Sequence, residues 1–256
     1  MPAADLDLLL SLAPRAGDIA LRYFQKRPKS WEKDGDQGPV SEADLAIDTF
    51  LKENLTAARP GYGWLSEETE DDTARLAAKR VFIVDPIDGT RSFLAGHENF
   101  AIAMAVAEQG DVTAAVVHMP AKRITYAAAI GKGATKNGHA IAPTTRSEIK
   151  NARVLAAGAQ MNSDRWHKGP PPMERHFRSS LAYRLCLVAE GRFDGMLTLR
   201  PSWEWDCSAG ALICEEAGAV VTDAENQRHK FNSASSQMDG IIAAGPKLHS
   251  AVMAYL

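Results

Sequence analysis

The chain contains 256 residues, of which 45% are hydrophobic and 24% are charged, and its formal net charge is −3. This composition is typical of a globular protein with one or two domains, and it excludes disordered, fibrous and disulfide-scaffold proteins. The slight acidic excess provides no basic field that would attract a nucleic acid polymer.

The sequence also argues against export or membrane insertion. No apolar stretch approaches the roughly 18 residues of a membrane-spanning helix, and Met1 to Leu10 lack the pattern of a signal peptide. At a rise of about 1.5 Å per residue, Cys207 and Cys214 of one predicted helix lie roughly 10 Å apart, too far for a disulfide. We therefore expect a cytoplasmic protein without a membrane partner, in which these thiols and that of Cys186 are buried and reduced.

Apolar periodicity and turn residues predict the elements of the first half in chain order. They are a helix over Asp5–Gln25, a loop over 27–39, a helix from Ser41 to about Leu55, a strand at Trp64–Leu65, an acidic segment over Glu67–Asp72 and a strand over Val81–Val84. Apolar runs at 101–107, 112–118 and 124–129 follow closely on one another, with a hairpin signal at Gly110-Asp111. These three runs predict an antiparallel meander.

The pattern changes after about residue 140, where predicted helices alternate with predicted strands. The elements are a strand over Val154–Ala157, helices over Leu181–Glu190 and Cys207–Ala217, strands near Val220 and Ile241, and a helix from Pro246. Such alternation is typical of an α/β arrangement. We therefore predict an N-terminal α+β half over 1–140 and a C-terminal α/β half over 141–256, joined in one compact unit.

The segment Val84-Asp-Pro-Ile-Asp-Gly-Thr90 is the strongest chemical signal in the chain. Two carboxylates, at Asp85 and Asp88, follow a buried strand. Pro86 restricts the turn between them, so the two carboxylates and the Ile87 carbonyl can point at one place. Converging oxygen donors suit a hard cation such as Mg²⁺, and a helix beginning at Thr90 would offer N–H groups to an anion. The same residue types are also common in a simple turn, which leaves that alternative open.

Two further acidic segments point to the same chemistry. Glu67 and Glu68 follow the apolar pair at Trp64–Leu65, so one carboxylate can project from the end of a strand. Asp206 lies between bulky residues at the start of a predicted helix, in the run Trp203-Glu-Trp-Asp206. An aspartate in that place also suits a helix N-cap, which is the structural alternative for Asp206.

Taken together, the segments resemble those of the inositol monophosphatase family. The resemblance runs from Val40 to about Gly245, and its two signatures stand at Val81–Phe93 and Trp205–Gly218, with Ser66-Glu67-Glu68 upstream. It implies a layered αβαβα sandwich of the sugar phosphatase type. It also implies a lithium-sensitive, Mg²⁺-dependent phosphomonoesterase that works as a homodimer on a small phosphorylated metabolite.

The resemblance also implies a set of site residues. The metal ligands are Glu67, Asp85, the Ile87 carbonyl, Asp88 and Asp206, which together hold two to three Mg²⁺ ions. Thr90, backed by Asp44, orients a metal-activated water for direct attack on phosphorus, and Glu67 assists. The substrate contacts Asp88, Gly89, Thr90 and Asp206. Lys33 resembles a family lysine near the phosphate.

The resemblance leaves the substrate open. The stretch Met196–Ser202 carries no acid where the inositol-selective branch has a glutamate, whereas Glu204-Trp205-Asp206 is similar to the 3′(2′),5′-bisphosphate nucleotidase branch. An inositol phosphate and adenosine 3′,5′-bisphosphate are the two leading substrates, and histidinol phosphate is the alternative. Arginines could bind a second phosphate. The candidates are Arg178, Arg184 and Arg200. A non-catalytic phosphate- or metal-binding protein that acts through partners is the alternative of another class, and the complete set of acids speaks against it.

Overall fold

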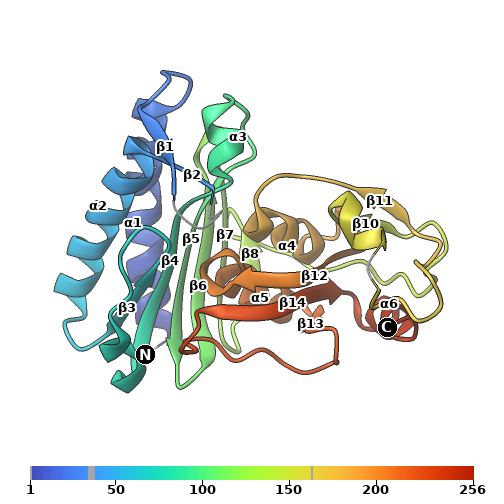
Figure 1. Ribbon diagram of the computed structural model, residues 1–256. Helices are drawn as coiled ribbons and strands as arrows, with labels where there is room; N and C mark the ends of the chain where they lie inside the picture. Colours follow the sequence, from blue (N-terminus) through green and yellow to red (C-terminus); the bar gives the residue numbers. More distant parts are fainter. Residues whose placement is uncertain (1, 34–37, 163) are drawn as a thin grey trace.

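The computed structural model describes residues 2–33, 38–162 and 164–256, and their elements stack as helix, sheet, helix, sheet, helix (Figure 1). The first layer holds α1 (Pro2–Tyr23) and α2 (Glu42–Ala58), and the middle layer holds α4 (Leu181–Ala189) and α5 (Glu204–Ala217). The last layer is α6 (Pro246–Met253). This is the five-layer sandwich that the resemblance implies.

The larger sheet lies between the first and middle helical layers. In spatial order its strands are β3 (Gly63–Ser66), β4 (Arg80–Asp88), β5 (Ala101–Glu108), β6 (Asp111–Met119), β7 (Ile124–Ala129), β8 (Ala134–Lys136) and β9 (His139–Ala140). Only the β3–β4 pair is parallel among the described strands of this sheet, and the predicted meander of β5, β6 and β7 is confirmed. Strands β8 and β9 were not predicted, because two or three partly exposed residues give no apolar run.

The smaller sheet lies between the middle helices and α6. Its spatial order is β11 (Glu174–His176), β10 (Arg153–Leu155), β12 (Gly195–Trp203), β14 (Gln237–Ala244) and β13 (Val220–Thr222). Strand β10 is parallel to both of its neighbours, whereas β14 is antiparallel to both of its own, so the sheet is mixed. The sequence analysis missed β12, because Pro201 interrupts its apolar run at a shift in register.

Strand β4 leads into the site, and its position is fixed because both of its faces are buried. Phe82 and Val84 pack against α1 and α2, whereas Val81 and Ile83 face the middle helices. Burying each of these side chains contributes roughly 1.5–3 kcal/mol. The middle helices also pack closely, because a Cβ atom on Gly210 of α5 would lie 2.6 Å from Leu185 Cδ1 of α4.

Several local predictions were wrong. The predicted strand over Val81–Val84 does not stop at Asp85, because β4 continues to Asp88 through a shift in register. The predicted loop over 27–39 contains the antiparallel pair β1 (Ser30–Glu32) and β2 (Pro39–Ser41), and its residues 34–37 lie outside the described part of the chain. By contrast, the helix predicted over Asp5–Gln25 is confirmed as α1, which continues through Pro14.

The remaining helical elements are short. They are α3 (Thr90–Leu94) and the 3₁₀ turns at Thr73–Ala77, Pro120–Lys122 and Gly158–Asn162. The three cysteines are buried and form no disulfide. Among the described residues, no helix combines the length and the hydropathy needed to cross a membrane.

Candidate active site

Asp85 is the innermost acid of the site. It lies on β4 opposite Ala103 of β5, and its exposed fraction is 0%. Neither carboxylate oxygen has a hydrogen-bond partner among the described residues. A buried carboxylate without donors is costly, so this group requires either a proton or a nearby cation.

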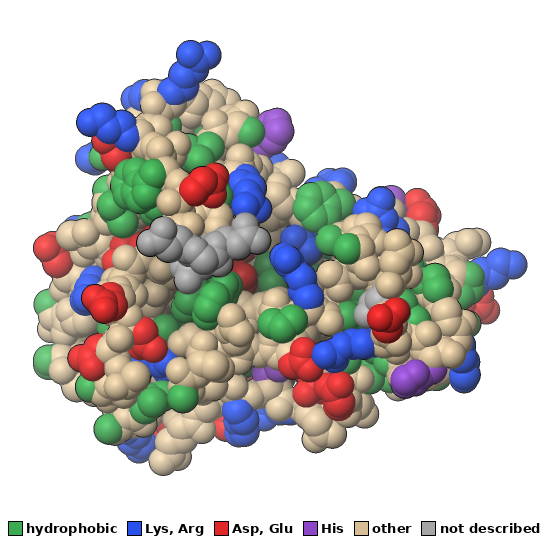
Figure 2. All heavy atoms as spheres, viewed as in Figure 1, with side chains coloured by type: hydrophobic (Ala, Val, Ile, Leu, Met, Phe, Trp, Pro, Cys, Tyr) green, Lys and Arg blue, Asp and Glu red, His purple; other side chains and the backbone are tan. Residues whose placement is uncertain are grey.

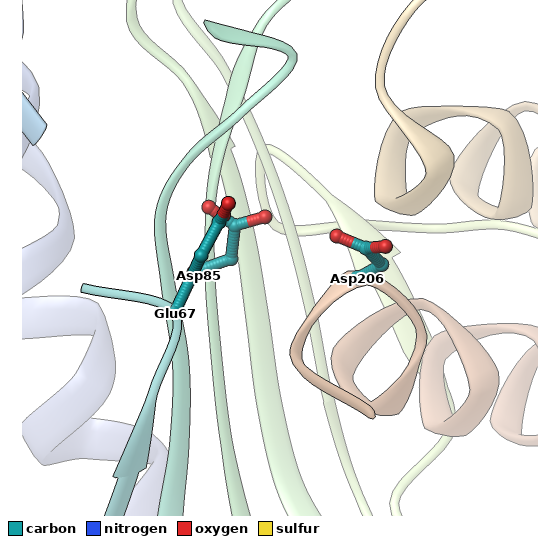
Figure 3. Close-up of side chains that lie close together, drawn as sticks. All are labelled: Glu67, Asp85 and Asp206. Atoms are coloured by element: carbon teal, nitrogen blue, oxygen red, sulfur yellow. The ribbon is translucent and has the colours of Figure 1, made fainter. Parts of the chain in front are cut away.

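Two other acids come close to Asp85. The parallel register of β3 and β4 sets Ser66 beside Val84, and therefore brings the next residues, Glu67 and Asp85, side by side. One oxygen each of Glu67, Asp85 and Asp206 lies within 4.8 Å of the others. Figure 3 shows Asp206 facing the other two carboxylates from the start of α5. The sequence thus identified three acids that the fold brings together.

The electrostatics of these three acids favour a cation. Burial, and then the charges of neighbouring acids, raise the pKa of Asp85 well above its ordinary value. The same two causes raise the pKa of Asp206, and burial raises that of Glu67 despite the charge of Lys33. All the side-chain donors are carboxylate oxygens, the ligands that Mg²⁺ and Ca²⁺ prefer. The donor set therefore fits a hard divalent cation.

Asp206 is not a helix N-cap, so the structural alternative for this residue was wrong. The N-cap of α5 is Trp203, and Asp206 lies in the first turn with its carboxylate directed at Asp85. The neighbouring Glu204 has a different task. Its two oxygens accept hydrogen bonds from the N–H groups of Asn232 (2.5 Å) and Ser233 (2.8 Å), so it holds the connection before β14.

Asp88 links the half of the molecule that holds the larger sheet to the half that holds the smaller sheet. Its Oδ2 accepts hydrogen bonds from Ser180 Oγ and the Ala182 N–H, each at 2.7 Å, and its Oδ1 accepts one from the Leu181 N–H at 3.1 Å. Burial raises the pKa of Asp88, while these hydrogen bonds act in the opposite direction. Asp88 thus caps the start of α4, and its role as a metal ligand and substrate contact stays a prediction.

Thr90, Asp44 and Ile87 form a second predicted group that the fold brings together. Thr90 Oγ1 lies 3.1 Å from Asp44 Oδ1 and 3.0 Å from the Ile87 carbonyl oxygen. The other oxygen of Asp44 accepts hydrogen bonds from the N–H and the hydroxyl of Ser41, which completes a capping box at the start of α2. The carboxylate that faces Thr90 is therefore held on both sides.

Lys33 contacts two acids at the edge of the site, and its place near a phosphate stays a prediction. Its Nζ lies 2.6 Å from Glu67 Oε1 and 3.0 Å from Glu68 Oε1. Burial, and then the charge of Glu67, raise the pKa of Glu68 to about 7. The sequence analysis gave Glu68 no role, although its position beside Glu67 was the available signal.

A cleft of about 820 Å³ opens above these acids, between the halves that hold the two sheets. Figure 2 shows this face hollowed between the two parts, with Lys and Arg side chains gathered beside the hollow. Besides the acids, its described lining includes Gly89, Thr90, Arg184 and Arg200. Arg184 Nε is buried and has no partner among the described residues. Arg178, the third arginine of the prediction, does not line the cleft in the described part of the chain, and its guanidinium lies over the Phe193 ring.

Comparisons with known proteins show what this chain is similar to. The model of the inositol monophosphatase family matches residues 4–256. The chain is 38% identical over 201 residues to an inositol-1-monophosphatase of Rhizobium meliloti, covering 73% of this chain and 72% of that protein. It is 30% identical over 224 residues to the 3′(2′),5′-bisphosphate nucleotidase CysQ of Salmonella typhimurium, covering 85% and 90%. A solved Thermotoga maritima IMPase superposes with a TM-score of 0.83 at 25% identity, covering 100% and 96%.

Proposed function

The chain belongs to the inositol monophosphatase family of phosphatases, and we propose that it uses Mg²⁺ to hydrolyse the phosphomonoester of a small metabolite. The observation that carries this proposal is the carboxylate of Asp85. It is fully buried, its oxygens have no partner among the described residues, and two other acids lie within 4.8 Å. Glu67, Asp85 and Asp206 would hold the metal, with the Ile87 carbonyl and Asp88 as the further ligands that the resemblance implies.

Bound divalent cations would supply charge for the phosphoryl oxygens and lower the pKa of a water molecule. The protein's own part is to place the other groups. Thr90 Oγ1 can donate its proton to Asp44 Oδ1, which leaves its lone pairs free to accept a hydrogen bond from the attacking water. Thr90 and Asp44 would therefore orient the water, and Glu67 would accept its proton.

Gly89 would let the phosphate approach the backbone. Its φ of +101° lies in the left-handed region, and a Cβ atom there would come within 3.1 Å of the Asn99 carbonyl oxygen. The chain turns at this residue into α3, whose first N–H groups have no partner within the helix. The Gly89 and Thr90 amides would then bind phosphoryl oxygens, next to the carboxylates of Asp88 and Asp206.

The arginines of the cleft favour a substrate with a second anionic group. Arg184 and Arg200 both line the cleft, and the Nε of Arg184 is buried without a partner in the described chain. Arginine binds phosphate oxygens in a fixed geometry with several donors. Adenosine 3′,5′-bisphosphate meets this requirement better than an inositol monophosphate, so we propose it as the first substrate to test.

The test is Mg²⁺-dependent phosphate release from adenosine 3′,5′-bisphosphate, inositol 1-phosphate and histidinol phosphate, with Asp206→Asn as the inactive control. We expect Arg184→Gln to lower kcat/KM for the bisphosphate by at least tenfold more than for inositol 1-phosphate. Arg178→Gln, which changes an arginine outside the cleft, should affect both substrates equally. Release that survives chelation of all divalent metal would contradict the metal-dependent function.

A further inference from the structure

The segment that carries Glu67 and Glu68 leaves the edge of the larger sheet, and few backbone contacts hold it. The Glu67 N–H donates to the Val84 carbonyl oxygen at 3.2 Å, which is the last contact that continues the β3–β4 pairing. Beyond it, an exposed acidic stretch leads into the 3₁₀ turn at Thr73–Ala77. The position of the Glu67 carboxylate therefore depends on side chains that hold this segment.

Asp48 of α2 holds the segment on both sides of the two glutamates. Its Oδ1 accepts a hydrogen bond from Ser66 Oγ at 2.5 Å, and its Oδ2 accepts one from Thr69 Oγ1 at 2.6 Å. Ser66 immediately precedes Glu67, and Thr69 immediately follows Glu68. The Asp48 carboxylate thus joins Ser66 to Thr69 and closes a small loop. Glu67 and Glu68 are the two residues between them.

Trp64 fixes the direction of the hydrogen bond between Thr69 and Asp48. Its Nε1 donates to Thr69 Oγ1 at 3.1 Å. Because an indole N–H is only a donor, the Thr69 hydroxyl accepts there and directs its own proton to Asp48. Asp48 is 7% exposed and Ser66 is 3% exposed, so little water competes for the contact between these two residues. A carboxylate that accepts a hydrogen bond on each of its two oxygens has no equal substitute in an amide, which has one acceptor oxygen.

We propose that Asp48 is a positioning residue for the metal site, which it serves by holding Glu67 against Asp85. Asp44 and Asp48 lie four residues apart and therefore project from one face of α2. Asp44 reaches Thr90, the first residue of α3, and Asp48 reaches Ser66, the last residue of β3. One turn of one helix thus aligns both the residue that orients the water and the glutamate ligand. This inference rests on the proposed function, because it assigns Asp48 to the same metal.

The test compares Thr69→Val with Thr56→Val. Both replace a threonine by a side chain of the same shape, but the Thr56 hydroxyl donates only to the Lys52 carbonyl oxygen within α2. The readout is the affinity of the metal-free protein for Mg²⁺ in the absence of substrate, measured by calorimetry. We expect Thr69→Val to weaken binding about tenfold, as loss of a group that orients a metal ligand commonly does. Thr69→Ser should restore the affinity, and Thr56→Val should leave it unchanged.

Asp48→Asn provides the second arm. It should weaken Mg²⁺ binding by a similar factor, and the double variant Asp48→Asn/Thr69→Val should be no weaker than the single ones, because both break the same contact. Steady-state kinetics should show a higher half-saturating Mg²⁺ concentration with little change in kcat at saturating metal. If Asp48→Asn does not fold, the Thr69 pair decides.

Two failures are distinguishable. If the wild-type protein binds Mg²⁺ and Thr69→Val binds it equally well, the role of Asp48 is refuted while the proposed function stands. A lower melting temperature of Thr69→Val with unchanged Mg²⁺ affinity would have the same meaning, because Asp48 would then be only structural. If the wild-type protein binds no Mg²⁺, the proposed function fails and this inference fails with it.

Discussion

Asp85→Asn removes the central charge of the three-carboxylate group without changing the size of the side chain. We expect the substitution to stabilise the metal-free protein and to abolish its stabilisation by Mg²⁺. The reason is that Asp85 is fully buried, has no hydrogen-bond donor among the described residues, and lies within 4.8 Å of two other acids. In the metal-free state its charge opposes folding.

The size of the effect follows from two estimates. At an effective dielectric constant of about 20, two unit charges 4.8 Å apart repel each other by roughly 3.5 kcal/mol. Protonation limits the penalty, because holding a carboxyl of ordinary pKa 3.8 protonated at pH 7.5 costs about 5 kcal/mol. The new amide N–H groups lose about 1–3 kcal/mol if they find no acceptor. A net gain of about 2 kcal/mol raises the melting temperature of a chain of this size by roughly 4–8 °C.

The assay is thermal unfolding at pH 7.5 in EDTA and in excess Mg²⁺. Wild-type protein at a Mg²⁺ concentration of 100 Kd should gain about 2.7 kcal/mol, whereas Asp85→Asn should gain nothing. Asp194→Asn is the matched control, since Asp194 is also buried but accepts a hydrogen bond from the Arg153 N–H at 2.8 Å. It should lower stability in both conditions. An Asp85→Asn protein that is less stable than wild type in EDTA would refute the reasoning.

Three further predictions concern neighbouring residues. Thr90→Val removes the hydroxyl that contacts Asp44 and should lower kcat by a factor of about 10²–10⁴, measured by steady-state kinetics. The Mg²⁺ affinity should stay within a few-fold of the wild-type value. A kcat within fivefold of wild type would contradict the assigned role. Because the pKa of Glu68 is raised to about 7, the folded state binds this proton more tightly than the unfolded state does, so the metal-free protein should lose stability as pH rises from 4.5 to 7. Urea unfolding across this range should show a flatter dependence for Glu68→Gln, and equal slopes would count against the shift. Gly210→Ala places a Cβ atom 2.6 Å from Leu185 Cδ1 and should cost about 1–3 kcal/mol of unfolding free energy, again by urea titration, whereas a neutral result would mean that α4 and α5 can separate freely.

The sequence was most informative where one short segment determines both structure and chemistry. The run from Val81 to Thr90 predicted a buried strand followed by two acids, and β4 carries both Asp85 and Asp88. The meander of β5, β6 and β7 was equally readable, since each strand is a continuous apolar run with a short connection. Glu67, Asp85 and Asp206 were identified as one group only through the resemblance, because no local pattern relates Asp206 to the other two.

What escaped prediction depends on contacts between distant parts of the chain. The hydrogen bonds from Ser180, Leu181 and Ala182 to Asp88 join residues of different halves, and no spacing in the sequence encodes them. The choice between Arg184, which lines the cleft, and Arg178, which is outside its described lining, was likewise invisible. Strand β12 was missed for a local reason, because Pro201 falls within it and breaks the apolar pattern.

The arrangement of the acids has a consequence for the order of events during protein synthesis. Glu67 and Asp85 belong to the larger sheet, whose strands are all translated by residue 140, whereas Asp206 lies on α5 in the second half. Domains commonly begin to fold from the N-terminal side as the chain leaves the ribosome. If the larger sheet forms before α5 is translated, Glu67 and Asp85 come together, with Lys33 beside Glu67, before Asp206 joins them. In that order the third carboxylate would meet the other two last, when α5 packs onto the larger sheet.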